Sequence, residues 1–248
     1  IPEIVKVLHK SILALALLTC GQIISAQGFG ISAGVGVATV KMSDLKLYQE
    51  HLLDGFPVEG KMISNFPPHV SGSLNLFRVI SNDLRIGIEY SLLSSGARAH
   101  YSDFSGSMDA NQVILNHAAV LTANYRLLGG ERLQFLTFGS LSGSYSMLEI
   151  SQYILANSQY FGSYYDSYSL KYRSLSPLVA FGLEGLLNVY GFSLAIDGGY
   201  YLDLTGELEY TEDSNYMLRD PDDTDRILRT DWTGFRARLK LIITFNNP

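Results

Sequence analysis

Apolar and polar side chains alternate along most of the chain after residue 27, with a period of two residues. In the last such segment, Arg236, Arg238 and Lys240 share one side. The other side is wholly apolar and consists of Phe235, Ala237, Leu239, Leu241, Ile243 and Phe245. Because successive side chains of a strand point to opposite faces, this period predicts β-strands with one apolar face. Eight segments follow it: residues 28–41, 70–80, 83–93, 113–127, 133–147, 177–187, 190–204 and 231–248.

The connections between these segments alternate between short and long. The short ones are residues 81–83, 128–131 and 188–191, and the long ones are residues 42–68, 102–111, 149–174 and 205–231. Short turns at one end and long loops at the other are typical of an up-and-down antiparallel barrel in an outer membrane. A Greek-key sandwich has no reason to sort its loops in this way. We therefore predict an all-β fold: a closed barrel of eight strands with extracellular long loops.

The first long connection contains a short helical pattern, "SDLKLYQEHLLDG". Ser43 or Asp44 is suited to cap its start. Leu45, Tyr48 and Leu52 then fall on one side of the helix. We predict one short helix here and no second domain.

The N-terminal residues predict an export signal. Lys6, His9 and Lys10 precede the apolar run "SILALALLTCG", and small or polar residues follow as far as Ala26. We assign residues 1–26 to a cleaved signal and residues 27–248 to the barrel. Cys20 permits an alternative, a lipid attached to that cysteine, although Thr19 is a poor match before it. A single cysteine excludes an internal disulfide framework.

The apolar faces favour a membrane over water as the surroundings. They reach about the 9–11 residues that a tilted strand needs to cross hydrocarbon. The opposite faces combine Gly, Ser and Ala with a few charges, and a barrel of eight strands is only wide enough for its own side chains. The predicted lumen charge network is Arg85, Glu89, Arg126, Glu184, Asp197, Asp203, Arg236, Arg238 and Lys240.

Charges in such a confined space must be paired, because an isolated buried ion is very unfavourable. We expect Asp197 to meet Lys240, and Asp203 to meet Arg236 or Arg238. The lumen is therefore predicted to be filled rather than to form an open pore. The formal net charge of −6 argues against a nucleic-acid partner, because there is no basic surplus to meet phosphates.

Aromatic residues near the strand ends fit the interfacial girdles of membrane barrels. They are Phe29, Tyr90, Tyr125, Tyr190, Phe192, Tyr200, Trp232 and Phe245. The same residues also fit the core of a secreted soluble barrel that binds a small ligand. That alternative explains the alternation but not the sorting of the loops.

With these features, residues 28–245 resemble the small eight-stranded outer-membrane barrels, the class that holds OmpX and the transmembrane domain of OmpA. They are especially similar to the "outer membrane protein beta-barrel" proteins common in Bacteroidetes. The resemblance implies the outer membrane of a Gram-negative bacterium, with membrane lipid and lipopolysaccharide as partners. It also implies recognition by the barrel-assembly machinery through a C-terminal strand ending in an aromatic residue. Leu239, Leu241, Ile243 and Phe245 match that signal, and "NNP" after Phe245 departs from it.

Two loop segments are candidates for chemistry or binding. The acidic run of residues 220–226 offers Asp220, Asp222, Asp223 and Asp225 as weak calcium ligands, but it lacks the Gly and the final Glu of a calcium loop. We expect a solvated acidic loop, no metal and no cofactor. The third long connection carries candidates for contact with an extracellular ligand: Tyr160, Tyr164, Tyr165, Tyr168 and Tyr172. The simpler interpretation is that these tyrosines extend two strands as a rigid hairpin.

An outer-membrane lipid-modifying enzyme would need a nucleophile and a histidine oriented by a carboxylate. The mature chain has His51, His69, His100 and His117, but no spacing singles out a triad. A narrow porin is the other alternative, and eight strands leave little room for one. We expect no catalytic residues. The predicted function is structural, or an interaction at the cell surface through the loops.

Overall fold

The computed structural model describes residues 28–54, 61–104, 106–158, 162–204 and 206–246. The predicted export signal, with Cys20, lies outside these residues. The described part contains one helix, α2 (Ser43–Asp54), and ten strands. The strands are β1 (Gly28–Ala38), β2 (Lys61–Asn65), β3 (His69–Val79), β4 (Leu84–Asp103), β5 (Gly106–Gly129), β6 (Leu133–Ser158), β7 (Gly162–Val189), β8 (Phe192–Asp203), β9 (Glu209–Tyr210) and β10 (Gly234–Asn246).

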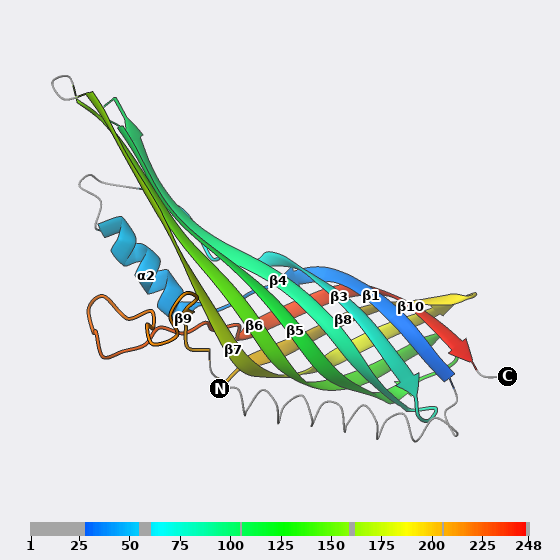
Figure 1. The fold of residues 1–248 in the computed structure, drawn as a ribbon. Coiled ribbons are helices and arrows are strands. Elements are labelled where there is room, and N and C mark those ends of the chain that lie inside the picture. The colour runs from blue at the N-terminus through cyan, green and yellow to red at the C-terminus, as the bar shows by residue number, and fades with distance from the viewer. Residues whose placement is uncertain (1–27, 55–60, 105, 159–161, 205, 247–248) are drawn as a thin grey trace.

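Eight of these strands form a closed ring, as the sequence predicted (Figure 1). Each strand pairs antiparallel with its neighbour in the chain, in the order β1, β3, β4, β5, β6, β7, β8 and β10. The ring closes where β10 pairs with β1 over eleven residues, from Gly28 opposite Asn246 to Ala38 opposite Arg236. β2 and β9 are not part of the ring. β2 pairs with β4 at residues 97–100, and β9 pairs with β7 at Tyr172 and Arg173. The fold is an up-and-down antiparallel barrel.

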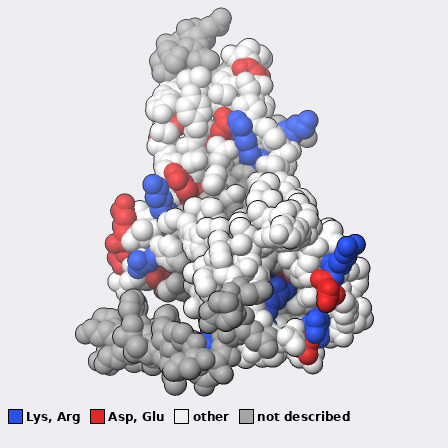
Figure 2. Space-filling model, turned by 90° about the vertical axis from the view of Figure 1, so that its right-hand side faces the viewer, with Lys and Arg blue, Asp and Glu red and all other residues white. Residues whose placement is uncertain are grey.

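The two faces of each strand differ as the alternation predicted. On β1, Val35 is 62% exposed while Ser32 is 6% exposed, and on β10, Leu239 is 53% exposed while Arg238 is 6% exposed. The exterior is thus a continuous apolar surface, and the polar residues point inward. In Figure 2 uncharged atoms make up most of the visible face, and charged atoms form small mixed groups. Among the described residues, no helix has the length and apolar character needed to cross a membrane.

The three short connections lie at one end of the barrel, which we call the turn end. The opposite end, which we call the mouth, has walls of unequal height (Figure 1). β1, β3, β8 and β10 have 11 to 13 residues, whereas β4, β5, β6 and β7 have 20 to 28. The tall strands therefore rise as a sheet above the rest of the barrel.

The length of these strands shows that two of the predicted loops are wrong. Most of residues 102–111 and 149–174 belong to strands, as the β4–β5 and β6–β7 pairs show. The sequence prediction began β7 at Pro177, and proline cannot donate to a ladder inside a sheet. Here it lies where β8 ends, and its carbonyl accepts the backbone N–H of Leu204 at 3.2 Å. The strand therefore continues through Pro177 toward the mouth.

Helix α2 forms where the sequence predicted it. Together with residues 206–232, which connect β8 to β10, it covers the mouth; we call these two segments the lid. Met42, just before α2, and Phe66, just after β2, are both buried and have positive φ angles of 45° and 48°. Such backbone conformations cost roughly 1–3 kcal/mol in residues other than glycine, so burial under the lid must stabilise them.

Candidate functional site

A buried cluster of charges fills the middle of the barrel. Arg238 of β10 lies between two carboxylates: its Nη1 is 2.5 Å from Oε1 of Glu89, and its Nη2 is 2.7 Å from Oδ2 of Asp197. Lys240, two residues on, places its Nζ 2.5 Å from Oδ2 of Asp197 and 3.0 Å from Oε2 of Glu184. These five side chains are each at most 7% exposed. Strands β4, β7, β8 and β10 supply them, so the cluster joins both sides of the barrel.

The remaining residues of the predicted network lie around this cluster. Arg85 donates to Glu184 at 2.7 Å, nearer the turn end. Arg126 lies at the rim instead, where it pairs with Asp83 of the first turn at 2.6 Å. Asp203 lies nearer the mouth and accepts hydrogen bonds from the Ser176 hydroxyl and, at 3.0 Å, from the backbone N–H of Trp232. The structure thus brings Asp197 to Lys240. Asp203 accepts hydrogen bonds from neutral donors, and its charge also acts on the guanidinium of Arg236.

Arg236 is the most confined cation of the network. It is 4% exposed, and its guanidinium carbon lies 4.0 Å from the centre of the Tyr201 ring, a favourable cation–π distance. Within the described residues, its Nε and Nη2 have no hydrogen-bond partner, and neither has Oε2 of Glu89. Buried polar groups of this kind usually bind internal water. Charged side chains therefore occupy the middle of the barrel, and some of their polar atoms remain available to water.

Two apolar layers enclose the charged layer. Toward the turn end lie Phe77, Leu136, Leu186, Ala195 and Ile242. Toward the mouth lies a larger group, the mouth core, which combines inward residues of the barrel with residues of the lid. It consists of Ala38, Val40, Met42, Leu45, Phe66, Leu93, Ala97, Ile114, Leu148, Ile150, Leu178, Leu208, Leu218, Leu228 and Trp232. An ion crossing the lumen would have to pass both layers.

Trp232 does not belong to the predicted aromatic girdle, so the prediction is wrong for this residue. It is fully buried in the mouth core, and its indole N–H donates to the Ser146 hydroxyl at 2.8 Å. Other predicted girdle residues do face outward: Phe29 and Phe245 stack on the exterior with ring centres 4.9 Å apart. The alternation could not place Trp232, because it precedes β10 and belongs to the lid.

Polar contacts fix the lid to the barrel. Gln49 of α2 is completely buried, donates to the carbonyl of Ala110 at 3.0 Å, and accepts from Nε2 of Gln112 at 2.9 Å. Asp44 accepts hydrogen bonds from the Arg226 guanidinium and, at 3.0 Å, from the backbone N–H of Arg229. These contacts link the first and last connections of the chain. Sequence reasoning missed Gln49 and Gln112, although a glutamine on the apolar side of a short helix was a signal for a buried partner.

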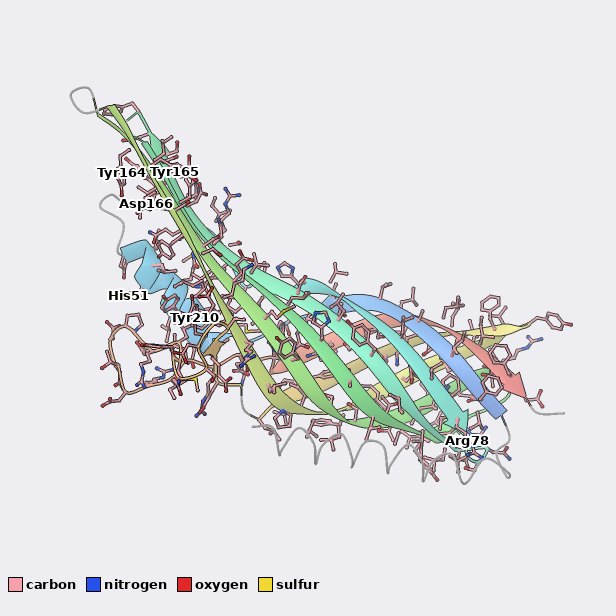
Figure 3. The ribbon with its side chains drawn as sticks, in the orientation of Figure 1. His51, Arg78, Tyr164, Tyr165, Asp166 and Tyr210 are labelled. Atoms are coloured by element: carbon pink, nitrogen blue, oxygen red, sulfur yellow. The ribbon has the colours of Figure 1, made fainter. Side chains whose placement is uncertain are left out.

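Above the lid, β6 and β7 continue as a raised hairpin, with β5 beside β6. Figure 3 shows Tyr164, Tyr165 and Asp166 near its end, and Tyr210 lower down where the lid meets β7. The strand pairing runs without interruption to Ser158 opposite Gly162, so the hairpin interpretation of the tyrosines is confirmed. Tyr164 and Tyr165 are exposed, whereas Tyr172 packs against the mouth core. Tyr160 lies outside the described residues.

Tyr48, Tyr172 and Tyr210 lie close together where the lid meets β7. Burial, with smaller contributions from Tyr172 and Tyr168, raises the pKa of Tyr48 to about 12. Burial also raises the pKa of Tyr172, and Tyr210 and Tyr168 add to the effect. The rings of Tyr172 and Tyr210 lie 5.6 Å apart. These phenols therefore stay protonated at neutral pH and serve as packing groups with one polar end.

The acidic run of the lid is organised by its own hydrogen bonds. Oδ1 of Asp220 accepts the backbone N–H of Asp222, Asp223 accepts that of Asp225, and Arg226 pairs with Asp220 at 3.2 Å. A cavity of about 170 Å³ separates this run from α2, with Tyr48, His51 and several carboxylates in its lining. The described residues contain no group of three or more side chains placed to hold a metal ion.

The histidines of the described residues lie on four different elements: α2, β3, β4 and β5. His117 faces outward on β5, and its Nδ1 lies 2.6 Å from the hydroxyl of Tyr90. The ring of His100 lies 2.9 Å from Asp109, which also accepts from Arg98 at 2.9 Å. Burial raises the pKa of Asp109, but the hydrogen bonds from Arg98 and His100 outweigh it and hold that pKa below its usual value. The hydrogen bonds described for His100 and His117 go to Asp109 and Tyr90, not to a serine hydroxyl.

The closed ring of eight antiparallel strands and its apolar exterior define a membrane-spanning β-barrel. This is the architecture of the small outer-membrane barrels of Gram-negative bacteria, the class that the sequence resembles. Its features carry the assignment: short turns at one end, a polar interior and taller strands at the opposite end.

Comparison with known proteins found similarities among solved structures. No family model and no curated protein matches the sequence. Among solved structures, Ail, the attachment invasion locus protein of Yersinia pestis, is 13% identical with a TM-score of 0.41, over 88% of this chain and 99% of that chain. Neisserial surface protein A is 11% identical with a TM-score of 0.33, over 89% and 99%. The N-terminal barrel domain of Pseudomonas aeruginosa OprF is 10% identical with a TM-score of 0.28, also over 89% and 99%.

Proposed function

We propose that this chain is an outer-membrane protein that anchors a raised surface hairpin, and that it acts by contact with another molecule rather than by transport or catalysis. The observation that carries the proposal is the combination of a lumen occupied along its length with a β6–β7 hairpin that continues well beyond the lid. A barrel that conducted solute would need an open path, and a purely structural barrel would not need the added height.

The occupied lumen supports the part of the proposal that excludes transport. Arg238 and Lys240 bind the three carboxylates of the cluster, and the mouth core lies above them under the lid. Separating such buried pairs is costly, because each ion would lose its partner in a medium of low dielectric constant. The buried network thus acts as a rigid filling that fixes the cross-section of the barrel.

The exterior supports the proposed partners in the membrane. Leu239, Leu241, Ile243 and Phe245 all lie on the outward face of β10, as a signal read by the barrel-assembly machinery would require before closure. The apolar surface contacts lipid, and lipopolysaccharide is the proposed neighbour at the level of the mouth. Replacing Phe245 with serine should reduce the amount of assembled barrel, with Phe235→Ser as a control at the other end of the same face.

Two measurements test the proposal. Purified protein in a planar bilayer should give no stable conductance steps, and regular steps would contradict a sealed lumen. In intact cells, a membrane-impermeant maleimide should label Ser167→Cys on the raised hairpin but not Ser81→Cys in the first turn. Both variants should react after lysis. Labelling of both positions in intact cells, or of Ser81→Cys alone, would contradict the proposed orientation.

A further inference from the structure

Arg236 carries a buried positive charge on the mouth side of the central ion pairs. Its side chain is 4% exposed, yet its Nε and Nη2 have no hydrogen-bond partner in the part of the chain that the structure describes. Most buried polar atoms of folded proteins are hydrogen bonded, so two such donors on one side chain need an explanation. Burying a cation without a bonded partner is also costly, because the protein solvates it less well than water does.

The neighbouring Arg238 shows what these two nitrogens can hold. Arg238 donates from Nε at 3.1 Å and from Nη2 at 2.7 Å to the carboxylate of Asp197. Both nitrogens lie on one edge of the planar guanidinium, and two parallel N–H groups match the two oxygens of a carboxylate. Arg236 presents the same edge to the lumen. Its chemistry therefore fits a second carboxylate.

The lumen carboxylates near Arg236 do not supply this contact. Glu89 gives its Oε1 to Arg238. Asp203 accepts hydrogen bonds from the Ser176 hydroxyl and from the backbone N–H of Trp232. The charges of Glu89 and Asp203 both act on Arg236, but neither provides an acceptor to its Nε or Nη2. The acceptor for this edge must therefore come from outside the described side chains.

The orientation of the Arg236 guanidinium is already fixed by an aromatic ring. The centre of the Tyr201 ring lies 4.0 Å from the guanidinium carbon, so one face of the planar group is covered. Hydrogen bonds can then form only at the edges of the group. A donor pair held in place before a ligand arrives loses little conformational entropy on binding, which favours affinity.

Two buried hydroxyls can supply further donors. Ser71 of β3 and Ser95 of β4 are 2% and 3% exposed, and within the described residues their Oγ atoms have no hydrogen-bond partner. Strand register places Ser71 in the same row as Arg238, across β1. Ser95 lies one inward position nearer the mouth than the β4 residue that pairs with Ser71, just as Arg236 lies one inward position nearer the mouth than Arg238. The hydroxyls therefore occupy the level of Arg236 in the barrel.

We propose that Arg236 is the centre of a binding site for a small carboxylate, which accepts hydrogen bonds from Nε and Nη2 through its two oxygens and from the hydroxyls of Ser71 and Ser95. The inference goes beyond the proposed surface function and does not depend on it. Because Arg236 lies nearer the mouth than Arg238, the ligand enters from the mouth, past the lid and the mouth core. The lid thus controls access to the site.

The chemistry of the site favours a monovalent planar anion over other small ligands. A halide has a single centre and cannot give each N–H its own acceptor. Sulfate or doubly charged phosphate would bring a second negative charge close to the carboxylates of the central cluster. Water can accept from both N–H groups, but it leaves the buried cation without a counter-ion. A carboxylate supplies two acceptors and one charge together.

The test measures binding of acetate to the folded full-length barrel in detergent micelles, with acetamide as an uncharged probe of similar shape. Equilibrium dialysis with labelled acetate should show saturation at a single acetate per barrel, and excess acetamide should not displace it. Urea unfolding gives a second readout, in which sodium acetate replaces sodium chloride at constant ionic strength. Above the Kd, each tenfold rise in acetate should raise the ratio of folded to unfolded barrel about tenfold.

Substitution of Arg236 separates this site from other acetate contacts. Arg236→Lys keeps the charge but lacks the two-donor edge, so acetate binding should weaken at least about tenfold. Arg236→Met should abolish binding. Without acetate, Arg236→Met should unfold at no lower urea concentration than the native chain, because it removes a buried cation that lacks a bonded counter-ion. Arg98→Met changes an arginine whose side chain is 53% exposed, and this control should bind acetate like the native chain.

Three results would overturn the inference. Absence of acetate binding to the native barrel would leave water as the partner of Arg236. Acetate binding that persists in Arg236→Met would place the ligand elsewhere. Displacement of acetate by excess acetamide would show that the site does not recognise the charge of its ligand.

Discussion

Arg238 connects the two sides of the lumen, and its replacement by methionine is the most direct test of the buried network. The guanidinium donates to Asp197 through Nε at 3.1 Å and Nη2 at 2.7 Å, and to Glu89 through Nη1 at 2.5 Å. Methionine keeps much of the length of the side chain without the charge. Asp197 would retain Lys240 at 2.5 Å, whereas Oε2 of Glu89 already has no hydrogen-bond partner.

The expected loss follows from the burial of these groups. The side chains of Arg238, Glu89 and Asp197 are at most 5% exposed. Removing one member of a buried ion pair typically destabilises by about 3–5 kcal/mol, because the other charge stays buried without compensation. Adding Glu89→Gln removes that charge, so the double variant should recover most of the loss, to within about 1–2 kcal/mol of the native chain.

Arg98→Met is the matched control. Arg98 also pairs with an aspartate, Asp109 at 2.9 Å, but its side chain is 53% exposed. An exposed pair of this kind contributes only about 0–1 kcal/mol. Urea unfolding in detergent micelles compares the variants with two probes: the fluorescence of Trp232, which is the only tryptophan, and the gel mobility shift of the folded barrel. Agreement of the two midpoints supports a single transition.

Equal losses for Arg238→Met and Arg98→Met would refute the reasoning, because burial would then not decide the strength of these pairs. A double variant that is less stable than Arg238→Met would also refute it, since the penalty could not come from an uncompensated Glu89.

Other predictions concern closure, the mouth core and pH. Gly36→Ala should hinder closure and cost about 1–3 kcal/mol, because its Cβ would meet the carbonyl oxygen of Ala237, whereas Gly72→Ala enters open space and should be neutral in the same gel assay. Trp232→Ala should cost about 3–5 kcal/mol through the cavity it leaves, as measured by the thermal loss of strand circular dichroism. Tyr48 has a pKa raised from 10.0 to about 12, so its contribution to lid stability should be complete below pH 10 and lost as pH rises through 12. Spectrophotometric titration should show a late-ionising tyrosine that Tyr48→Phe removes; an unchanged titration curve would contradict this.

The alternation of side chains was sufficient to predict the barrel because the exterior and the interior impose opposite requirements on every strand. Ile31 and Ser32 on β1, for example, could not exchange places without exposing a hydroxyl to lipid. The alternation of short and long connections indicated which end of each strand lies at the turn end of the barrel. The pairing of Asp197 with Lys240 could also be predicted, since both residues face inward on adjacent strands.

The height of the strands could not be predicted in the same way. Above the membrane, the outer face of β7 meets water, so Ser167, Ser169 and Lys171 interrupt the apolar alternation although the strand continues. The second segment of the lid, residues 206–232, escaped prediction for a related reason. Its apolar residues, such as Leu208, Leu218 and Leu228, are spaced ten apart within an acidic segment, and only the fold brings them together in the mouth core.

The lid also joins the two ends of the barrel chain. The seam between β1 and β10 continues into it through hydrogen bonds from the backbone N–H of Thr39, Lys41 and Met42 to the carbonyls of Phe235, Thr233 and Asp231, at 2.8, 3.0 and 3.1 Å. Asp44 then contacts Arg226 and Arg229. An intermediate in which the first and last strands are still apart cannot make these contacts.

In the proposed orientation, the assembled lid is therefore a marker of completed insertion that can be detected from outside the cell. An antibody fragment selected against the folded surface shared by α2 and the acidic segment would bind only barrels in which β10 has paired with β1. Counting stained against total molecules over time would give the rate of that last step in living bacteria.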